Sequence, residues 1–426
     1  MNNRRRLVLA AAATLLSSTL PAAVRAAMGP NDKFDLVIRG GEVLDPSRRL
    51  RGVRDVGIRN GIVEAVEAGI PAERALRTIN AAGRLVVPGL IDLHSHVFPY
   101  GSAIGIPADE LVPHQGTTTA VSAGDAGANN LAAFRRFIVA STRTRLFAFV
   151  HIANIGLGGF PIPELYNLDY ARTEDAARAL AENADILIGI KVRMSENVIA
   201  RHGLEPLKRA IRACELSQVP GAKVMCHIGG VETAGLMSEI LDLLRPRDIL
   251  THCYSGAPNI GGQFTNIVQD GKLLPAALNA KRRGVVFDVG HGGGSFDYTI
   301  AEAAIAAGAP PDVISSDIHV FSGNSPGMPY LTWVMSKFLN MGFSLEQVVA
   351  MATANPAGVI GKVPKLGTLE VGAPGDVSIL EVVEGPVEFV DTRNNKRQGK
   401  VHLRPVQTVA GGIAFGRPYA APFSVR

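Results

Sequence analysis

The chain lacks the features that define several classes of protein. Its 426 residues contain three cysteines, Cys214, Cys226 and Cys253, which are too few and too scattered for a disulfide framework. Charged residues make up 19% of the chain and aromatic residues 6%. We find no basic cluster interleaved with aromatic side chains, so the sequence argues against nucleic-acid binding. Beyond the N-terminus, no apolar run reaches the ~20 residues that a membrane span needs.

The first 26 residues predict an export signal. Three arginines, Arg4 to Arg6, precede an apolar stretch at 7–20, and Val24-Arg25-Ala26 has the small residues of a cleavage site. The paired arginines favour a twin-arginine signal, with an ordinary secretory signal as the alternative. Removal of residues 1–26 would take away four arginines and no acid, which lowers the formal net charge from +5 to +1. We therefore expect an exported bacterial protein, periplasmic or secreted.

What the chain has in abundance is apolar residues, at 47%, together with 46 glycines and 26 prolines, which is typical of a compact globular protein. Both ends of the chain combine short alternating strands with turns. The stretch 34–45 predicts two strands joined by a glycine hairpin, and Asn60-Gly61 is a strong hairpin signal within 55–66. The stretches 366–380 and 401–415 show the same combination of short alternating strands and turns. We expect residues 27–85 and 364–426 to build one small accessory β-sandwich domain.

Residues 86–363 have a different sequence pattern, in which short apolar runs alternate with segments of helical periodicity. Eight runs can be identified, at 86–96, 118–123, 146–152, 186–194, 223–228, 249–254, 285–289 and 313–317. Helices are predicted at 174–183, 206–216, 233–244 and 297–307, and a Gly- and Pro-rich insertion at 156–168 could form a lid or rim. This pattern predicts an α/β fold, a (β/α)8 TIM barrel whose catalytic side chains lie at the carboxyl ends of the strands.

Polar residues occur at the ends of these apolar runs. They are His94 and His96 in the first run, Lys191 in the fourth, His227 in the fifth, His252 in the sixth and Asp317 in the eighth. Side chains two residues apart on a strand point the same way, so His94 and His96 could bind one metal ion. A lone His-x-His would suit a solvated strand face equally well. The full set, in barrel order, favours a metal site.

The chemistry of a two-metal centre requires this mixture of side chains. Imidazoles and carboxylates bind zinc-like ions, and a bridging ligand must span two ions about 3.5–4 Å apart. A lysine cation cannot bridge them, whereas Lys191 converted by carbon dioxide to a carbamate offers two anionic oxygens. An unpaired buried lysine would otherwise be costly.

The ordered set resembles the amidohydrolase superfamily over essentially the whole chain after the signal. The resemblance rests on Pro88-Gly89-Leu90-Ile91-Asp92-Leu93-His94-Ser95-His96, on the lysine, histidines and aspartate named above, and on Ala352-Thr353-Ala354-Asn355-Pro356-Ala357. The segments Gly189-Ile190-Lys191-Val192-Arg193 and Thr251-His252-Cys253-Tyr254-Ser255-Gly256 are similar to the dihydroorotase-like branch, and closest to its amidohydrolase/deacetylase group. After Asp317, however, Ile318-His319-Val320-Phe321 departs from the Asp-x-Ala-Pro-His pattern of dihydroorotases, which argues against dihydroorotate as substrate.

The resemblance implies a role for each ligand. His94, His96, Lys191 and Asp317 would bind the more buried ion, while Lys191, His227 and His252 would bind the more exposed one. It further implies a metal-bridging hydroxide that attacks the substrate carbonyl, with Asp317 as general acid and base. The implied cofactors are two divalent ions, zinc by default with manganese or iron as alternatives, and carbon dioxide as the carbamate on Lys191.

Six further residues are candidates for substrate binding. Arg193 could clamp a substrate carboxylate or form a salt bridge with a neighbouring loop acid. His291 lies among glycines after the seventh run and could contact the substrate or leaving group. The weaker candidates are His151, Asn154, Tyr254 and His319. Asp92 is expected to orient a ligand, and we assign no role to His114, His202 and His402.

The sequence thus predicts a binuclear metal hydrolase that cleaves an amide or ester bond. Its expected reaction is deacetylation of a small, anionic, carboxylate-bearing substrate, and the expected assembly is a homo-oligomer. The main alternative is a cyclic-amide hydrolase of the dihydroorotase or hydantoinase kind. A non-catalytic scaffold is the third hypothesis, against which the complete set of ligands argues.

Overall fold

The computed structural model describes residues 28–29, 31–231, 233–256 and 266–415. The predicted export signal and residues 416–426 of the predicted accessory domain lie outside this part of the chain. The architecture below is that of the compact unit formed by residues from Lys33 onwards. Among the described residues, no helix combines the length and the hydropathy that crossing a membrane requires.

A parallel sheet of seven strands forms the centre of the molecule. Its strands follow the order β14-β11-β10-β9-β8-β7-β6, and every neighbouring pair is parallel. The strands are β6 (Leu90–Ser95), β7 (Thr117–Gly127), β8 (Arg145–His151), β9 (Leu187–Arg193), β10 (Lys223–His227), β11 (Ile249–Thr251) and β14 (Val286–Asp288). Seven of the eight predicted runs therefore contribute to this sheet.

The eighth predicted run, 313–317, does not form a regular strand. Single parallel bridges join Val313 to Asp288 in β14 and Ile318 to Ser95 in β6, so the segment connects the two edge strands of the curled sheet. The backbone of Asp317 is left-handed, with φ 50°, which ends the extended geometry. Apolar side chains of β6, β8, β10 and Val313 share one core cluster, as the curl requires.

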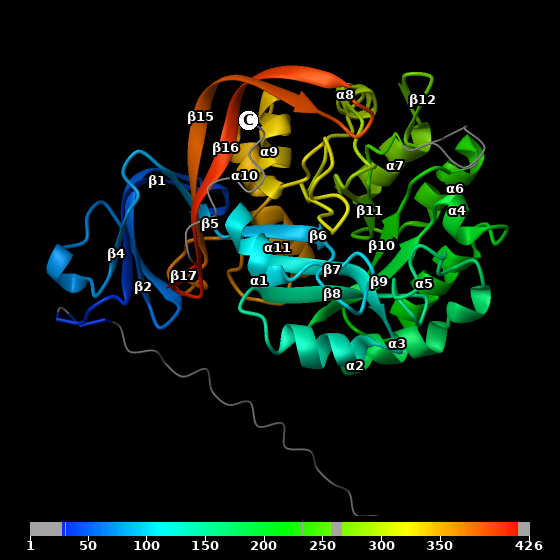
Figure 1. The fold of residues 1–426 in the computed structure, drawn as a ribbon, viewed down its shortest axis with the longest axis horizontal. Coiled ribbons are helices and arrows are strands. Elements are labelled where there is room, and N and C mark those ends of the chain that lie inside the picture. The colour runs from blue at the N-terminus through cyan, green and yellow to red at the C-terminus, as the bar shows by residue number, and fades with distance from the viewer. Residues whose placement is uncertain (1–27, 30, 232, 257–265, 416–426) are drawn as a thin grey trace, which may run out of the picture. The chain divides into compact units, whose positions relative to one another are not determined.

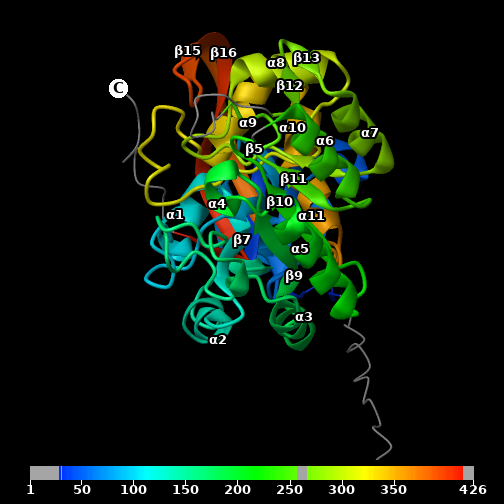
Figure 2. The ribbon, with the colours of Figure 1, turned by 90° about the vertical axis from the view of Figure 1, so that its right-hand side faces the viewer.

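Helices follow most of the strands. They are α1 (Ala108–Leu111), α2 (Leu131–Ala133), α3 (Thr173–Glu182), α4 (Glu196–Ile199), α5 (Glu205–Leu216), α6 (Ala234–Leu243), α7 (Pro275–Arg283), α8 (Tyr298–Ala306), α9 (Leu331–Asn340), α10 (Leu345–Met351) and α11 (Ala354–Ile360). The four predicted helices correspond to α3, α5, α6 and α8. Thr233 and Asp297 cap α6 and α8 by accepting bonds from backbone N–H groups. Helices α3 and α5 pack on each other and against β9 (Figure 2).

A second, mixed sheet contains strands from both ends of the chain (Figure 1). Its order is β17-β16-β15-β5-β1-β2-β3, and β4 also pairs with β1. The strands are β1 (Leu36–Asp45), β2 (Leu50–Arg59), β3 (Ile62–Glu67), β4 (Thr78–Asn80), β5 (Leu85–Pro88), β15 (Val377–Val390), β16 (Lys396–Ala410) and β17 (Ile413–Ala414). A separate pair, β12 (Val268–Gln269) and β13 (Lys272–Leu273), completes the described strands.

Two local predictions in the N-terminal region have different outcomes. The hairpin at Asn60-Gly61 is confirmed, because β2 and β3 pair antiparallel around these residues, both of which have positive φ. The glycine hairpin predicted within 34–45 is wrong. This stretch is the single strand β1, and the glycines produce a shift in its pairing with β2 between Ile38 and Gly41.

The predicted run 86–96 divides at Gly89 into two strands of different sheets. The strand β5 pairs with β1 and β15 in the mixed sheet, whereas β6 pairs with β7 in the parallel sheet. A Cβ atom at position 89 would lie 2.7 Å from Thr118 Cγ2 and 2.9 Å from Asp376 Cβ. Only glycine lets the backbone pass between the sheets at this point.

The Gly89→Ala substitution is therefore expected to lower the free energy of unfolding by about 1–3 kcal/mol, the usual cost of overpacking. Urea unfolding followed by circular dichroism measures this change. Gly69→Ala is the matched control, because a Cβ there would meet no atom within 4 Å. Equal stability of the two variants would contradict the tight passage at Gly89.

Candidate metal centre

The two histidines of the His-x-His pair converge on one carboxylate. His94 lies in β6 and His96 directly after Ser95, and both are buried. Their Nε2 atoms lie 3.3 Å and 3.0 Å from Oδ1 of Asp317. The backbone N–H of Asp317 donates to the carbonyl oxygen of His94 at 2.7 Å, which fixes the carboxylate against β6.

The other three predicted ligands lie beside this group. Lys191 Nζ in β9 is buried and lies 3.4 Å from His94 Nε2. The ring of His252, directly after β11, has its centroid 4.9 Å from that of His94 and 4.2 Å from that of His227, the last residue of β10. One ligand atom from each of His94, His252 and Asp317 lies within 4.8 Å of the others. The structure thus brings all six predicted ligands together.

Hydrogen bonds on the far side of the rings orient three of the histidines. His94 Nδ1 contacts Thr251 Oγ1 at 2.7 Å, and that hydroxyl donates to Asp288. His96 Nδ1 contacts Asp125 Oδ1 at 2.9 Å, and His252 Nδ1 contacts the carbonyl oxygen of Gly290 at 2.6 Å. In the neutral rings of His94 and His252, a proton on Nδ1 satisfies these acceptors and leaves the Nε2 lone pair for a metal ion.

Sequence reasoning missed the acceptors Asp125, Thr251, Asp288 and Gly290. Asp125 lies near the end of β7, and Asp288 is the last residue of β14. Both therefore carry the signal that identified the ligands, a polar residue at the end of an apolar strand. Asp92, which is expected to orient a ligand, accepts hydrogen bonds from the backbone N–H groups of His94 and Ser316.

Burial sets the protonation state of most of the cluster. It lowers the pKa of His252 to about 4 and those of His94 and His227 well below the usual range, so these rings are neutral. Burial would raise the pKa of Asp317, but its hydrogen bond with His96 and the neighbouring imidazoles lower it to about 2. His94, His227 and His252 therefore offer neutral imidazoles and Asp317 offers an ionised carboxylate, the forms that bind divalent metals.

The surroundings of His96 and His252 fit a bound metal ion. Burial opposes a charge on His96, but Asp125 and Asp317 raise its pKa to about 9, so these carboxylates attract positive charge to this point. Nε2 of His252 is buried without a hydrogen-bond partner among the described residues. A divalent cation would satisfy both this lone pair and the carboxylates, and the donor set fits it.

Two ligand residues have backbone conformations that L-residues rarely adopt. The φ angles are 62° at His252 and 50° at Asp317. The glycines opposite them leave no room for a side chain, because a Cβ at Gly290 would lie 2.9 Å from His252 Nδ1 and one at Gly292 would collide with the Asp317 carboxylate. Strained backbone of this kind is common at functional sites.

Arg193 forms the salt bridge with a loop acid that was the alternative to a substrate clamp. Its Nη1 lies 3.0 Å from Oε2 of Glu164 in the 156–168 insertion. Glu164 also lies 3.1 Å from Nε2 of His151, which is fully buried. Asn154 is buried, with Oδ1 unbonded among the described residues. His319 is partly buried, with its ring centroid 5.8 Å from that of His96.

The substrate-binding roles predicted for Tyr254 and His291 are not supported. The Tyr254 hydroxyl donates to the carbonyl oxygen of Ala309, and its ring is buried in the main core. His291 is buried against Phe296; its Nδ1 bonds the carbonyl oxygen of Gly292 and its Nε2 lies 2.7 Å from Lys337 Nζ. The Tyr254 hydroxyl and both ring nitrogens of His291 therefore have partners within the protein.

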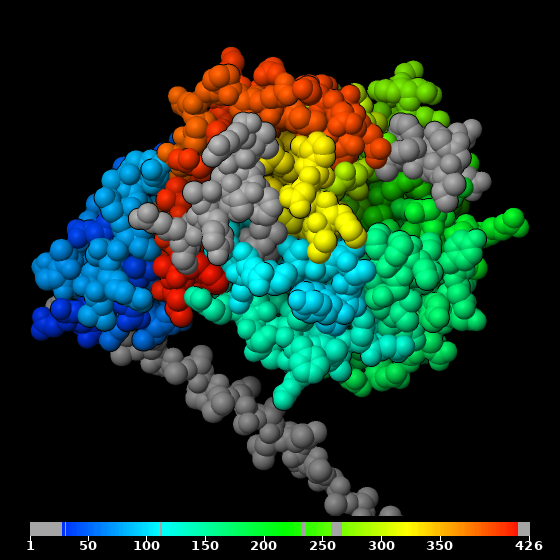
Figure 3. Space-filling model, viewed as in Figure 1, coloured from blue at the N-terminus to red at the C-terminus, as the bar shows by residue number. Residues whose placement is uncertain are grey.

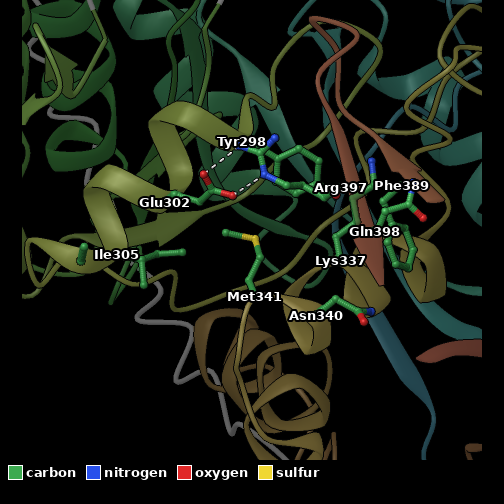
Figure 4. Close-up of a pocket in the computed structure, with 10 residues that line it drawn as sticks. Tyr298, Glu302, Ile305, Lys337, Asn340, Met341, Phe389, Arg397 and Gln398 are labelled. Atoms are coloured by element: carbon green, nitrogen blue, oxygen red, sulfur yellow. Dashed lines mark hydrogen bonds and ion pairs between the residues drawn. The ribbon is translucent and has the colours of Figure 1, made fainter. Parts of the chain in front are cut away.

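The loops that follow His96 and Asp317 contact each other. The backbone N–H of Val320 donates to the carbonyl oxygen of Ile104, and these loops lie next to each other at the surface (Figure 3). A separate cavity of about 330 Å³ lies between α8, α9 and the β15–β16 ribbon (Figure 4). None of the predicted site residues lines that cavity.

Comparisons with known proteins agree with this geometry. The model of the amidohydrolase family matches residues 295–411. Deacetylase Atu3266 of Agrobacterium fabrum is 33% identical over 357 residues, which cover 84% of this chain and 85% of the relative.

Two solved structures are similar over most of their length. The crystal structure of an adenine deaminase aligns with a TM-score of 0.81 and 29% sequence identity. The alignment covers 90% of this chain and 100% of the deaminase chain. The crystal structure of a dihydroorotase aligns with a TM-score of 0.80 and 31% sequence identity. The alignment covers 90% of this chain and 99% of the dihydroorotase chain. The chain therefore belongs to the amidohydrolase superfamily, as a dihydroorotase-like member, and is a hydrolase acting on carbon–nitrogen bonds.

Proposed function

We propose that the chain is a binuclear metal-dependent hydrolase that removes a small acyl group, such as acetyl, by cleaving an amide or ester bond. The observation that carries the proposal is a cluster of side chains at the carboxyl ends of the parallel strands. It contains the imidazoles of His94, His96 and His252, together with Lys191 and Asp317. The deacetylase name of the relative from Agrobacterium fabrum supports this reaction.

The proposed ligands divide into two sets that share one residue. His94, His96 and Asp317 would hold one ion and His227 and His252 the other, with Lys191 as a carbamate common to both. Bound divalent metal, proposed to be zinc, supplies Lewis acidity and a water of lowered pKa. Burial lowers the pKa of Lys191 to about 8. Its neutral amine can therefore attack carbon dioxide and lose a proton to form the carbamate.

The proposed proton carrier is Asp317. Its carboxylate is ionised and contacts His94 and His96, and its backbone is tied to β6. One carboxylate oxygen accepts a proton from the attacking water and returns it to the leaving nitrogen or oxygen. The scissile carbonyl would lie between this carboxylate and His252.

A cyclic-amide hydrolase is the second candidate, because the dihydroorotase structure is 31% identical and covers nearly all of its own length. Ring opening and acyl removal need the same ligands. For either reaction, we further propose that the chain forms a closed (β/α)8 barrel with an accessory β-sandwich domain built from residues 27–85 and 364–426. We also propose that it is exported to the periplasm or secreted and that it is a homo-oligomer.

The Asp125→Asn and Thr251→Val variants are expected to weaken metal binding by about 10–100-fold, because each loses a partner that orients a ligand histidine. Competition with a chromophoric chelator measures the affinity. Asp185→Asn is the matched control, since Asp185 is exposed and precedes β9, whose opposite end carries Lys191. Unchanged affinity in both site variants would mean that these hydrogen bonds do not organise a metal site.

The purified protein is expected to contain about two metal ions per chain, as the binuclear site requires, and in bicarbonate to gain the mass of one carbon dioxide. Elemental analysis and native mass spectrometry measure these quantities. The gain should disappear in Lys191→Met and persist in Lys223→Met, because Lys223 is also buried but lies at the start of β10, at the end opposite His227. One ion with unmodified Lys191 would indicate a mononuclear enzyme.

The proposed reaction is tested by acetate release from acetylated esters and amides, with dihydroorotate and hydantoin as cyclic alternatives. We expect turnover of acetylated compounds, and a loss in Lys191→Met greater than the ~10–100-fold cost of removing an orienting partner. Ring opening without acetate release would select the second candidate.

A further inference from the structure

An ion pair borders the cluster at the carboxyl end of β9. Arg193 follows Lys191 by two residues, and its Nη1 lies 3.3 Å and 3.0 Å from the two carboxylate oxygens of Glu164. Glu164 is 2% exposed and the Arg193 side chain 16%. His151 contacts the same carboxylate from the end of β8. Glu164 is thus a buried acid that the mechanism above does not use.

The segment that carries Glu164 is fixed at its base. Ala153 and Ala171 form an antiparallel bridge, and the N–H of Asn154 donates to the carbonyl oxygen of Tyr170 at 2.9 Å. Leu165, next to Glu164, is fully buried in the main core. The carboxylate is therefore held in place and is not carried on a free loop.

Arg193 lies beside the proposed ligands. It follows Lys191 by two residues in β9, and it is the register partner of His227 where β9 pairs with β10. Burial would raise the pKa of Glu164, but Arg193 and His151 lower it to about 2, so Glu164 is ionised. Burial keeps the pKa of His151 below its usual range. At neutral pH the three side chains together therefore carry no net charge.

We propose that Glu164 sets the charge preference of the substrate site: it neutralises Arg193, so that the site accepts a substrate whose group beside Arg193 is uncharged. A substrate carboxylate would have to displace Glu164 from Nη1 or lie beside a buried carboxylate of the same sign, and both are unfavourable. This inference rests on the proposed acyl hydrolysis. It replaces the expectation of an anionic substrate.

The test compares acetoxyacetate with acetoxyacetamide, two esters that differ in carrying a carboxylate or its neutral amide. Glu164→Gln keeps the shape of the side chain and removes its charge. With equal metal content confirmed, the ratio of kcat/KM for the anionic to the neutral ester should rise about tenfold or more, the size of one charge-assisted hydrogen bond. Glu302→Gln is the control, because Glu302 pairs with Arg397 in an exposed bidentate salt bridge and should leave the ratio unchanged.

The double variant Glu164→Gln/Arg193→Gln distinguishes neutralisation from clamping. If Glu164 only cancels the charge of Arg193, removal of both charges returns the ratio to that of the unmodified enzyme. If Arg193 holds a substrate carboxylate despite Glu164, the double variant loses the anionic ester selectively. A ratio about tenfold below that of the unmodified enzyme, the loss of one such bond, or no change in Glu164→Gln, would overturn the proposal. Because the double variant leaves no buried charge unpaired, it keeps the test valid if Glu164→Gln does not fold.

A readout without turnover separates this inference from the proposed function. If the unmodified enzyme hydrolyses neither ester, acyl hydrolysis of this kind fails, and calorimetric binding of propionate and propionamide to the same metal-loaded variants takes the place of kinetics. Glu164→Gln should then raise the affinity for propionate relative to propionamide. In the double variant, this relative affinity should return to that of the unmodified enzyme. Equal relative affinities in all variants would overturn the charge preference.

Discussion

The burial of many polar groups at one end of the parallel sheet is the constraint on which the rest of the site depends. A buried donor or acceptor without a hydrogen-bond partner costs about 1–3 kcal/mol, so each of these groups needs a partner within the protein. The structure supplies them in pairs, from His94 to Thr251, from His96 to Asp125 and from His252 to Gly290. Because the partners come from β7, β11 and the loop after β14, the hydrogen bonds of the ligands also hold the curled sheet together.

The curl in turn explains the unusual backbone at the site. The segment 313–318 must reach from β14 to β6, and its chain turns at Asp317, where φ is positive. Glycine is required opposite this turn, since a Cβ at Gly292 would occupy the position of the Asp317 carboxylate. The positive φ of Asp317 and its close packing against Gly292 therefore hold the proposed proton carrier against His94 and His96. An aspartate that rotated freely could adopt several other conformations.

The mixed sheet supports the site through a buried lysine. Lys337 in α9 donates to the carbonyl oxygens of Gly327 and Val390, and it contacts His291 at Nε2. Val390 ends β15, and His291 follows the glycine that binds His252. The C-terminal ribbon is thus linked to the loop that orients a proposed ligand, and Gly89 joins the two sheets at the start of β6. The ends of the chain form part of the support of the site.

The sequence by itself determined the periodic elements and the six clustered polar residues, because apolar spacing follows from strand and helix geometry and strand ends meet at one edge of a parallel sheet. It did not determine where side chains point after a strand has ended. Tyr254 and His291 turn into the core behind residues with positive φ, and Arg193 meets Glu164 from an insertion whose position no local pattern reveals. Only the tertiary structure decided these contacts, since each depends on a backbone turn or on a charge that is distant in the sequence.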